Sequence, residues 1–251
     1  MRYGLRAVVV VAALALACRW GVAQIGPRYV IELPGQGGGT AGMAQGKVQL
    51  AGQGLALIRF QGLSVLAVDA DGEAYSREAA AGWPAADVLL VLPPAAGRYD
   101  GLAPLQALRS GAPVIVAERE DGGAAELVQP AARQPAQAGA AQLYPMQVWN
   151  TLELRKQNTR LRVTAMAGAP GTRGVAGFML ELGNSRSSYR VYVSCREDEV
   201  ATLAQRLPGA DLALLPAPGA PRLLALRRGA AEVGMPAALT AAGYAFTAIK
   251  R

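Results

Sequence analysis

The chain has 251 residues, of which 52% are hydrophobic and 17% charged. This composition excludes an intrinsically disordered protein and fits one or two domains with a sizeable core. Three of the basic residues (Arg2, Arg6 and Arg19) lie in an N-terminal segment, and without them 22 basic residues face 18 acidic ones, a net charge of +4. With no basic cluster interleaved with aromatic residues, we expect no nucleic-acid partner.

Residues 1–23 have the features of an export signal. A basic start precedes an unbroken apolar run, Ala7 to Ala17, which is shorter than the roughly 20 residues that span a bilayer. The run has the proportions of a signal-peptide core. Cleavage after Ala23, lipidation of Cys18 and retention as a membrane anchor all remain open. Each predicts an exported, periplasmic protein that meets a membrane only through this segment.

Residues 24–46 are predicted as a flexible N-terminal segment with one short strand at 29–33, because Pro34 to Gly46 is rich in glycine. Glycine-containing turns separate β-rich stretches after it, and two strongly apolar runs indicate strands buried on both faces. A proline- and glutamine-rich loop, 130–142, marks the midpoint. The predicted strands are 47–50, 54–60, 63–69, 86–92, 113–117, 143–155, 160–166, 175–182, 188–194 and 211–215, and the predicted helices are 102–109, 123–128 and 197–206.

A meander of strands, a helix and a buried strand therefore occur twice in the predicted order. Two such halves, packed sheet on sheet with helices outside, form a four-layer αββα sandwich of the α/β (α+β) class. We expect a single domain of this kind over residues 47–251. The basic stretch 155–162 is predicted as a solvated hairpin edge, protected from aggregation by its charges. A surface for a partner or for anionic lipid is the alternative there.

Two stretches resemble the opening of a known fold. Residues 49–58 read Gln-Leu-Ala-Gly-Gln-Gly-Leu-Ala-Leu-Ile, and the strand at 63–69 ends in Asp69. They resemble the start of the metallo-β-lactamase fold, in the branch of L-ascorbate-6-phosphate lactonase-like and N-acyl-phosphatidylethanolamine phospholipase D-like proteins. Members of that branch usually read Trp-Leu-Gly-His-Ala in the first stretch, and Gln53 stands where their histidine would be.

The resemblance covers roughly residues 47–216 and locates the family's other metal ligands. The family places His-x-His-x-Asp-His-Leu after a buried strand, and here residues 96–102 correspond to that motif. Only its aspartate is kept, as Asp100, with Tyr99 before it. Non-ligating residues stand at the remaining positions: Arg98, the loop 167–171 and, in place of a bridging aspartate, Arg196. The resemblance thus implies the family's scaffold without any of its metal-binding histidines.

The family reaction implied by the resemblance is attack of a metal-activated water on an ester, lactone, amide or phosphodiester. The chain contains no histidine, and arginines at two ligand positions would repel a dication, so we expect no metal site and no cofactor. Ser-His-Asp and Cys-His catalysis are excluded within the chain. A disulfide is not expected either, since Cys195 is the one cysteine outside the export signal. Asp69 and Asp100 are weak catalytic candidates, with loop or helix capping as their structural alternative.

A remodelled cleft is the predicted binding site, formed by Gln53, Arg98, Tyr99, Asp100 and Arg196. A pair of guanidinium groups there would suit an anionic ligand. Alternatively, Arg196 and Asp100 form a salt bridge that fills the vacated metal site. Both arrangements are compatible with each other.

The sequence therefore predicts an exported, metal-free pseudoenzyme that acts as a binding or structural module in the cell envelope, with a protein partner there. The alternative is a divergent hydrolase of an ester, lactone or phosphodiester. It would use carboxylates and a metal held without histidine, such as calcium or magnesium with oxygen ligands.

Overall fold

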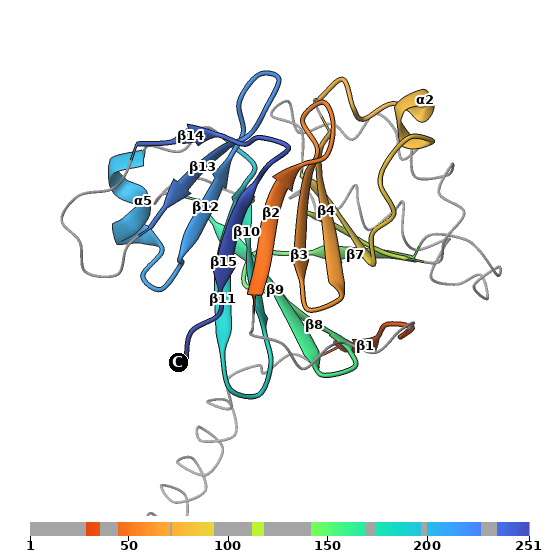
Figure 1. Ribbon diagram of the computed structural model, residues 1–251, viewed down its shortest axis with the longest axis vertical. Coiled ribbons are helices and arrows are strands. Elements are labelled where there is room, and N and C mark those ends of the chain that lie inside the picture. The colour runs from red at the N-terminus through yellow and green to blue at the C-terminus, as the bar shows by residue number, and fades with distance from the viewer. Residues whose placement is uncertain are drawn as a thin grey trace, which may run out of the picture.

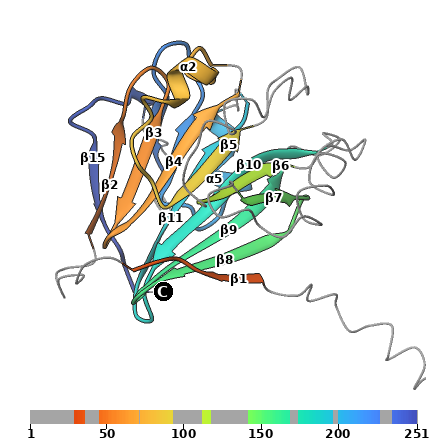
Figure 2. The same cartoon turned by 90° about the vertical axis from the view of Figure 1, so that its right-hand side faces the viewer.

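Two β-sheets pack face to face in the computed structural model of the protein (Figures 1 and 2). The structure describes residues 29–35, 45–70, 72–92, 112–117, 142–168, 174–196, 200–226 and 235–250. Strands account for 54% of these residues and helices for 7%. None of the helices in these ranges is long and apolar enough to cross a membrane.

The seven-stranded sheet comes mainly from the first half of the chain. Its order is β15-β2-β3-β4-β5-β6-β7, antiparallel from β15 to β4 and parallel from β4 to β7. The two long apolar runs of the sequence form its central parallel strands, as expected. The strands are β2 (Gln45–Leu50), β3 (Ala56–Phe60), β4 (Leu63–Asp69), β5 (Val88–Leu92), β6 (Pro113–Ala117), β7 (Gln142–Met146) and β15 (Tyr244–Thr247).

The eight-stranded sheet comes mainly from the second half. Its order is β1-β8-β9-β10-β11-β12-β13-β14, with parallel pairing at β1–β8 and β11–β12. The terminal strands exchange sheets, because β1 joins the second-half sheet and β15 joins the first. The strands are β1 (Tyr29–Glu32), β8 (Thr151–Lys156), β9 (Thr159–Ala167), β10 (Val175–Gly183), β11 (Ser188–Ser194), β12 (Leu212–Leu215), β13 (Arg222–Ala225) and β14 (Ala237–Ala238).

The core lies between the sheets, where apolar side chains from both inner faces meet. In β9 the residues Leu161, Val163 and Ala165 are fully buried, and the residues between them face outward. This two-residue alternation is what a half-buried strand requires. The inner residues of β9 belong to the same cluster as Ile58 and Leu90 of the opposite sheet, so a single core joins the two halves.

The predicted four-layer αββα class is wrong for the described chain, which is mostly β. Its helices are short: α2 (Arg77–Ala80) and α5 (Val200–Arg206). Figure 1 shows α5 beside β12 and β13, where Leu203 and Leu207 pack with Tyr192. The predicted helices 102–109 and 123–128 lie outside the described residues. A sheet face needs a covering layer only where it is apolar, and much of the outer face of the eight-stranded sheet is charged.

The predicted strand at 143–155 is two strands in different sheets. β7 ends at Met146 in the seven-stranded sheet, and β8 begins at Thr151 in the other. Between them the chain turns, with Trp149 at φ 70°. The backbone N–H of Trp149 donates to the carbonyl of Ala165 at 2.8 Å. The sequence pattern does not reveal this change of sheet between β7 and β8, because both strands supply residues to the inner faces.

Charges alternate across four neighbouring strands on the outer face of the eight-stranded sheet. The register places Glu153, Arg162, Glu181 and Arg190 in one row from β8 to β11. Arg190 Nε donates to Glu181 Oε2 at 3.0 Å, and Arg155 Nε donates to Glu153 Oε1 at 2.8 Å. Cross-strand pairs of opposite charge stabilise a sheet, so this row fixes the register where no helix is required.

Glu153 gives this row a pH dependence. Burial raises the pKa of its carboxyl, but the hydrogen bond and charge of Arg155, together with the charges of Arg160 and Arg162, outweigh burial and hold the pKa below its ordinary value. The ionised form is thus favoured by folding. Stability from this group is complete above the unfolded pKa of about 4.3 and is lost as the pH falls through the folded value.

We therefore expect Glu153→Gln to lower the free energy of unfolding by about 1–2 kcal/mol at pH 7. The difference from the wild type should shrink as the pH falls below about 4.3. Urea unfolding at several pH values measures it, with the exposed Glu78→Gln on α2 as control. A difference that stays constant at acid pH contradicts this assignment.

Candidate functional site

A cavity of about 520 Å³ opens between the sheets at the carboxyl ends of their parallel strands. The ends of β4 and β5 contribute from one sheet, and those of β11 and β12 from the other. Ligands of sheets with parallel strands commonly bind outside these ends. The polar side chains of the described lining are Gln53, Asp69, Glu73 and Ser194; the apolar ones include Leu92, Val193, Leu214, Leu215, Pro216, Pro218 and Pro221.

The chain turns immediately after β4 and brings two carboxylates to the cavity. Asp69 is the last residue of β4, and its carbonyl accepts from the N–H of Gly72 at 3.0 Å. A side chain at Gly72 would lie 3.1 Å from that same carbonyl, so the glycine permits the tight turn. Glu73 follows directly and is exposed, whereas Asp69 is half-buried. The turn thus presents both carboxylates along one wall.

Gln53 reaches the cavity on the turn between β2 and β3. Gly54 in this turn has φ 68°, a left-handed conformation that glycine adopts at little cost. Its N–H donates to the carbonyl of Gly219 at 3.1 Å, which joins the turn to the β12–β13 loop of the other sheet. Prolines restrict the backbone of that loop. The bond and the prolines together hold the cavity wall in place.

Ser194 lines the cavity at the end of β11 and is buried. Its hydroxyl donates to the carbonyl of Arg196 at 2.8 Å. Arg196 itself is exposed and does not line the cavity. Of the predicted cleft residues, Gln53 lines the cavity, and it does so together with Asp69, one of the two weak catalytic candidates. Arg98, Tyr99 and Asp100 lie outside the described residues, as does the predicted pairing of Arg196 with Asp100.

Sequence reasoning missed Glu73, Ser194 and the proline loop. A signal existed for the first, since Glu73 follows the predicted strand end at Asp69 by four residues. The proline spacing after β12 pointed to a rigid loop. Ser194 gave no signal of its own, because its place in the cavity depends on how the two sheets pack.

The chemistry of this lining suits a ligand that donates hydrogen bonds or carries positive charge. Two carboxylates and an amide oxygen accept hydrogen bonds, and no lysine or arginine is part of the described wall. The residues do not fit the dizinc centre implied by the resemblance. The whole sequence lacks imidazole ligands, and the described residues contain no group of three His, Cys, Asp or Glu placed to hold a metal ion.

Comparison with known proteins gives structural similarities only. No protein-family profile and no curated protein sequence matches the chain. The metallo-β-lactamase fold protein YhfI from Bacillus subtilis is similar with a TM-score of 0.43 and 14% identity, over 68% of this chain and 70% of that one. MEM-A1, a subclass B3 metallo-β-lactamase from a soil metagenome library, is similar with a TM-score of 0.37 and 14% identity, over 68% and 76% of the two chains.

Zn²⁺-bound PqqB from Methylobacterium extorquens is similar with a TM-score of 0.38 and 14% identity, over 67% of this chain and 71% of that one. The similar structures thus include metallo-β-lactamase fold proteins, the superfamily named by the sequence resemblance. Membership of that superfamily, the branch within it and the loss of the metal site stay predictions.

Proposed function

We propose that the protein is an exported, metal-free relative of the metallo-β-lactamase fold that binds a small ligand in the cavity between its sheets. The cavity itself is the observation that supports this function. Its volume of about 520 Å³ lies within the range of about 300–1,000 Å³ that small-molecule sites occupy. The predicted periplasmic location and a protein partner in the envelope are part of the same proposal.

The charges of the wall define the ligand class. Asp69 and Glu73 are both part of the lining, and the described lining residues include no lysine or arginine. Leu92 and Leu214 supply apolar surface beside them. The ligand that fits is a small organic cation, such as an amine with an apolar body. Sites of this type are lined mostly by apolar groups, with a few polar groups that fix orientation.

A carboxylate-dependent hydrolase is the second candidate, because Asp69 and Glu73 face one cavity. Calcium and magnesium bind through carboxylate, carbonyl and water oxygens. The described residues supply these two carboxylates, fewer than a calcium site normally uses. The binding function needs no further group, and we therefore prefer it.

We expect Asp69→Asn and Glu73→Gln each to weaken binding of an alkylammonium ligand about tenfold, because each removes one charge-assisted hydrogen bond. Isothermal titration of the full-length protein with primary and quaternary amines of increasing chain length measures this effect. Glu32→Gln is the matched control, since it removes an exposed carboxylate on β1.

Two results would contradict the proposal. If amines bind all variants equally or not at all, the cavity is not their site. If the purified protein holds stoichiometric calcium, magnesium or manganese that Asp69→Asn removes, the metal-dependent hydrolase replaces the binding function. Elemental analysis of wild type and variant distinguishes the two candidates.

A further inference from the structure

A second, wider groove runs along the edge of the seven-stranded sheet, formed by β15, β2 and the β3–β4 hairpin. Its volume is about 870 Å³. It shares no lining residue with the cavity between the sheets. The groove is therefore a separate candidate site. Its charged side chains are basic, whereas those of the cavity are acidic.

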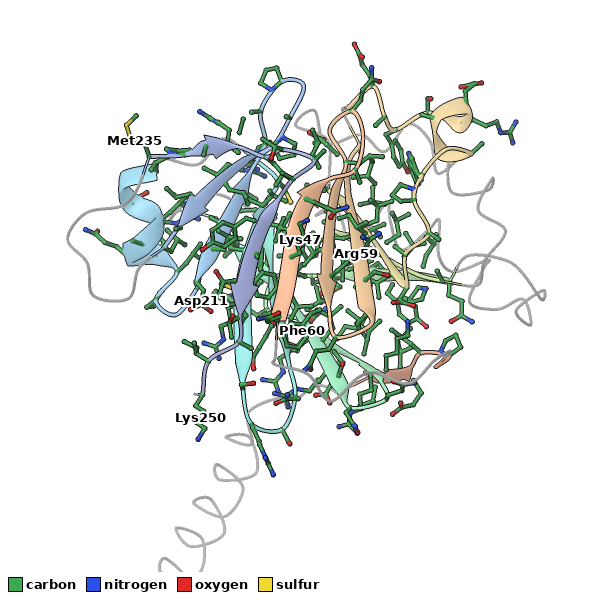
Figure 3. The ribbon with its side chains drawn as sticks, in the orientation of Figure 1. Lys47, Arg59, Phe60, Asp211, Met235 and Lys250 are labelled. Atoms are coloured by element: carbon green, nitrogen blue, oxygen red, sulfur yellow. The ribbon has the colours of Figure 1, made fainter. Side chains whose placement is uncertain are left out.

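Two cations lie side by side in this groove. The antiparallel register places Lys47 of β2 directly opposite Arg59 of β3. Figure 3 shows the pair on neighbouring strands of one sheet face. Directly opposite residues have Cβ atoms about 4.5–5.5 Å apart, and like charges in such pairs destabilise a sheet. An anion held between the two side chains would remove this repulsion.

No protein carboxylate in the described part of the chain performs that role. The ion pairs within 4.0 Å join Arg155, Lys156, Arg160, Arg162 and Arg190 to their acidic partners. Neither Lys47 nor Arg59 takes part in them, and no described Asp or Glu lines the groove. The charge of the pair is thus available to a ligand.

The rest of the described lining adds hydrogen-bond donors. Gln45, Gln61 and Thr247 contribute amide and hydroxyl groups. Two carbonyl acceptors at the β3–β4 turn already have partners: Thr159 Oγ1 donates to Gln61 O at 3.1 Å, and Lys156 Nζ donates to Gly62 O at 2.7 Å. These amide and hydroxyl groups can therefore add hydrogen bonds to the oxygens of an anion held by Lys47 and Arg59.

We propose that this groove binds a phosphate group, with Lys47 and Arg59 holding its oxygens from two sides. A phosphate offers several strong acceptor oxygens for one guanidinium and one ammonium group, with about two negative charges in a monoester and one in the diester of a lipid headgroup. The groove is larger than a phosphate ion, so the remainder of a phosphate ester has room beside it. The phosphate belongs either to a soluble ester or to a lipid headgroup, and the proposal is independent of the ligand of the cavity.

The test compares a groove variant with a matched control in the full-length protein. The groove variant is Lys47→Gln/Arg59→Gln, and the control is Arg186→Gln/Lys250→Gln, which removes two exposed cations elsewhere. Titration with glycerol phosphate at constant ionic strength tests the soluble ester. Co-sedimentation with phosphatidylglycerol vesicles, compared with phosphatidylcholine vesicles, tests the headgroup.

We expect the groove variant to bind the active probe at least about tenfold more weakly, while the control binds like the wild type. In the absence of phosphate, the groove variant should be at least as stable as the wild type, because the repulsion between Lys47 and Arg59 is gone. This stability shows that the variant folds. A groove-dependent response to glycerol phosphate identifies a soluble ester, and a groove-dependent response to vesicles alone identifies a lipid. No response to either probe, or an equal loss in both variants, overturns the proposal. Asp69→Asn should change neither response, so failure here is distinct from failure of the cavity function.

Discussion

Replacing Asp87 by alanine should lower the free energy of unfolding by about 3–5 kcal/mol, since it leaves a cation unpaired between the sheets. Asp87 precedes β5, and its Oδ2 accepts from the N–H and the hydroxyl of Ser64 at 2.8 and 3.0 Å. Its Oδ1 accepts from Lys156 Nζ at 2.7 Å. Both charged side chains are mostly buried, with 15% of Lys156 and 20% of Asp87 exposed. Removing the carboxylate therefore breaks three hydrogen bonds at once.

A double-mutant cycle with Lys156→Met separates the ion pair from the other bonds of Asp87. The Lys156 ammonium also donates to Gly62 O, so the single lysine variant should itself be destabilised. We expect a coupling energy of about 1–3 kcal/mol from urea unfolding of the four proteins. Lys250→Met is the control for loss of an exposed lysine. Strictly additive effects would show that the pair contributes nothing of its own.

This ion pair corrects the prediction made for the basic hairpin. The sequence indicates a solvated edge at 155–162, and Arg155 fits that description with half of its side chain exposed. Lys156 does not, because it crosses to the other sheet and bonds Asp87, 69 positions away. Thr159 makes a similar crossing to Gln61. A local charge pattern gives no information on partners this distant.

Strand positions were predictable where a buried strand requires a run of apolar residues. β5 is buried at all five positions, and its Val-Leu-Leu-Val-Leu run predicts a strand covered on both faces. The sheet that each strand joins was not predictable in the same way. Short stretches such as Arg222–Ala225 and Tyr244–Thr247 carry weak local signals, and they become strands because an existing sheet edge offers hydrogen-bond partners.

The candidate site was predictable to the extent that it depends on strand ends. Asp69 closes an evident strand, and parallel strands present such residues at one edge. The opposite wall was not predictable, because Ser194 and the proline loop reach the cavity only through the packing of the second sheet. Of the two arginines expected in the cleft, Arg196 does not line the described wall, and Arg98 lies outside the described residues.

The other large effect that we expect is at Phe246, whose ring connects the two sheets. It stacks on Tyr189 of β11 with ring centroids 4.2 Å apart, and on Phe60 of β3 at 6.1 Å. Phe246 is 5% exposed although β15 lies at the edge of its sheet, where β2 is its one partner among the described strands. Phe246→Ala should therefore cost about 3–5 kcal/mol, the usual effect of removing a buried aromatic ring. Thermal and urea unfolding measure the loss.

Gly46 provides an independent check of the same contact. It lies opposite Phe246 in the register, and a Cβ at this position would clash with the Phe246 ring and approach the carbonyl of Arg59 to 2.8 Å. We expect Gly46→Ala to be destabilising in the wild type and less so when combined with Phe246→Ala, because the smaller side chain removes the clash with the ring and leaves the close approach to the Arg59 carbonyl. Tyr244→Ala, on the same strand with 39% exposure, should cost under about 1 kcal/mol. If Tyr244→Ala and Phe246→Ala both lower the free energy of unfolding by under about 1 kcal/mol, the contacts of β15 do not hold the two sheets together at this edge.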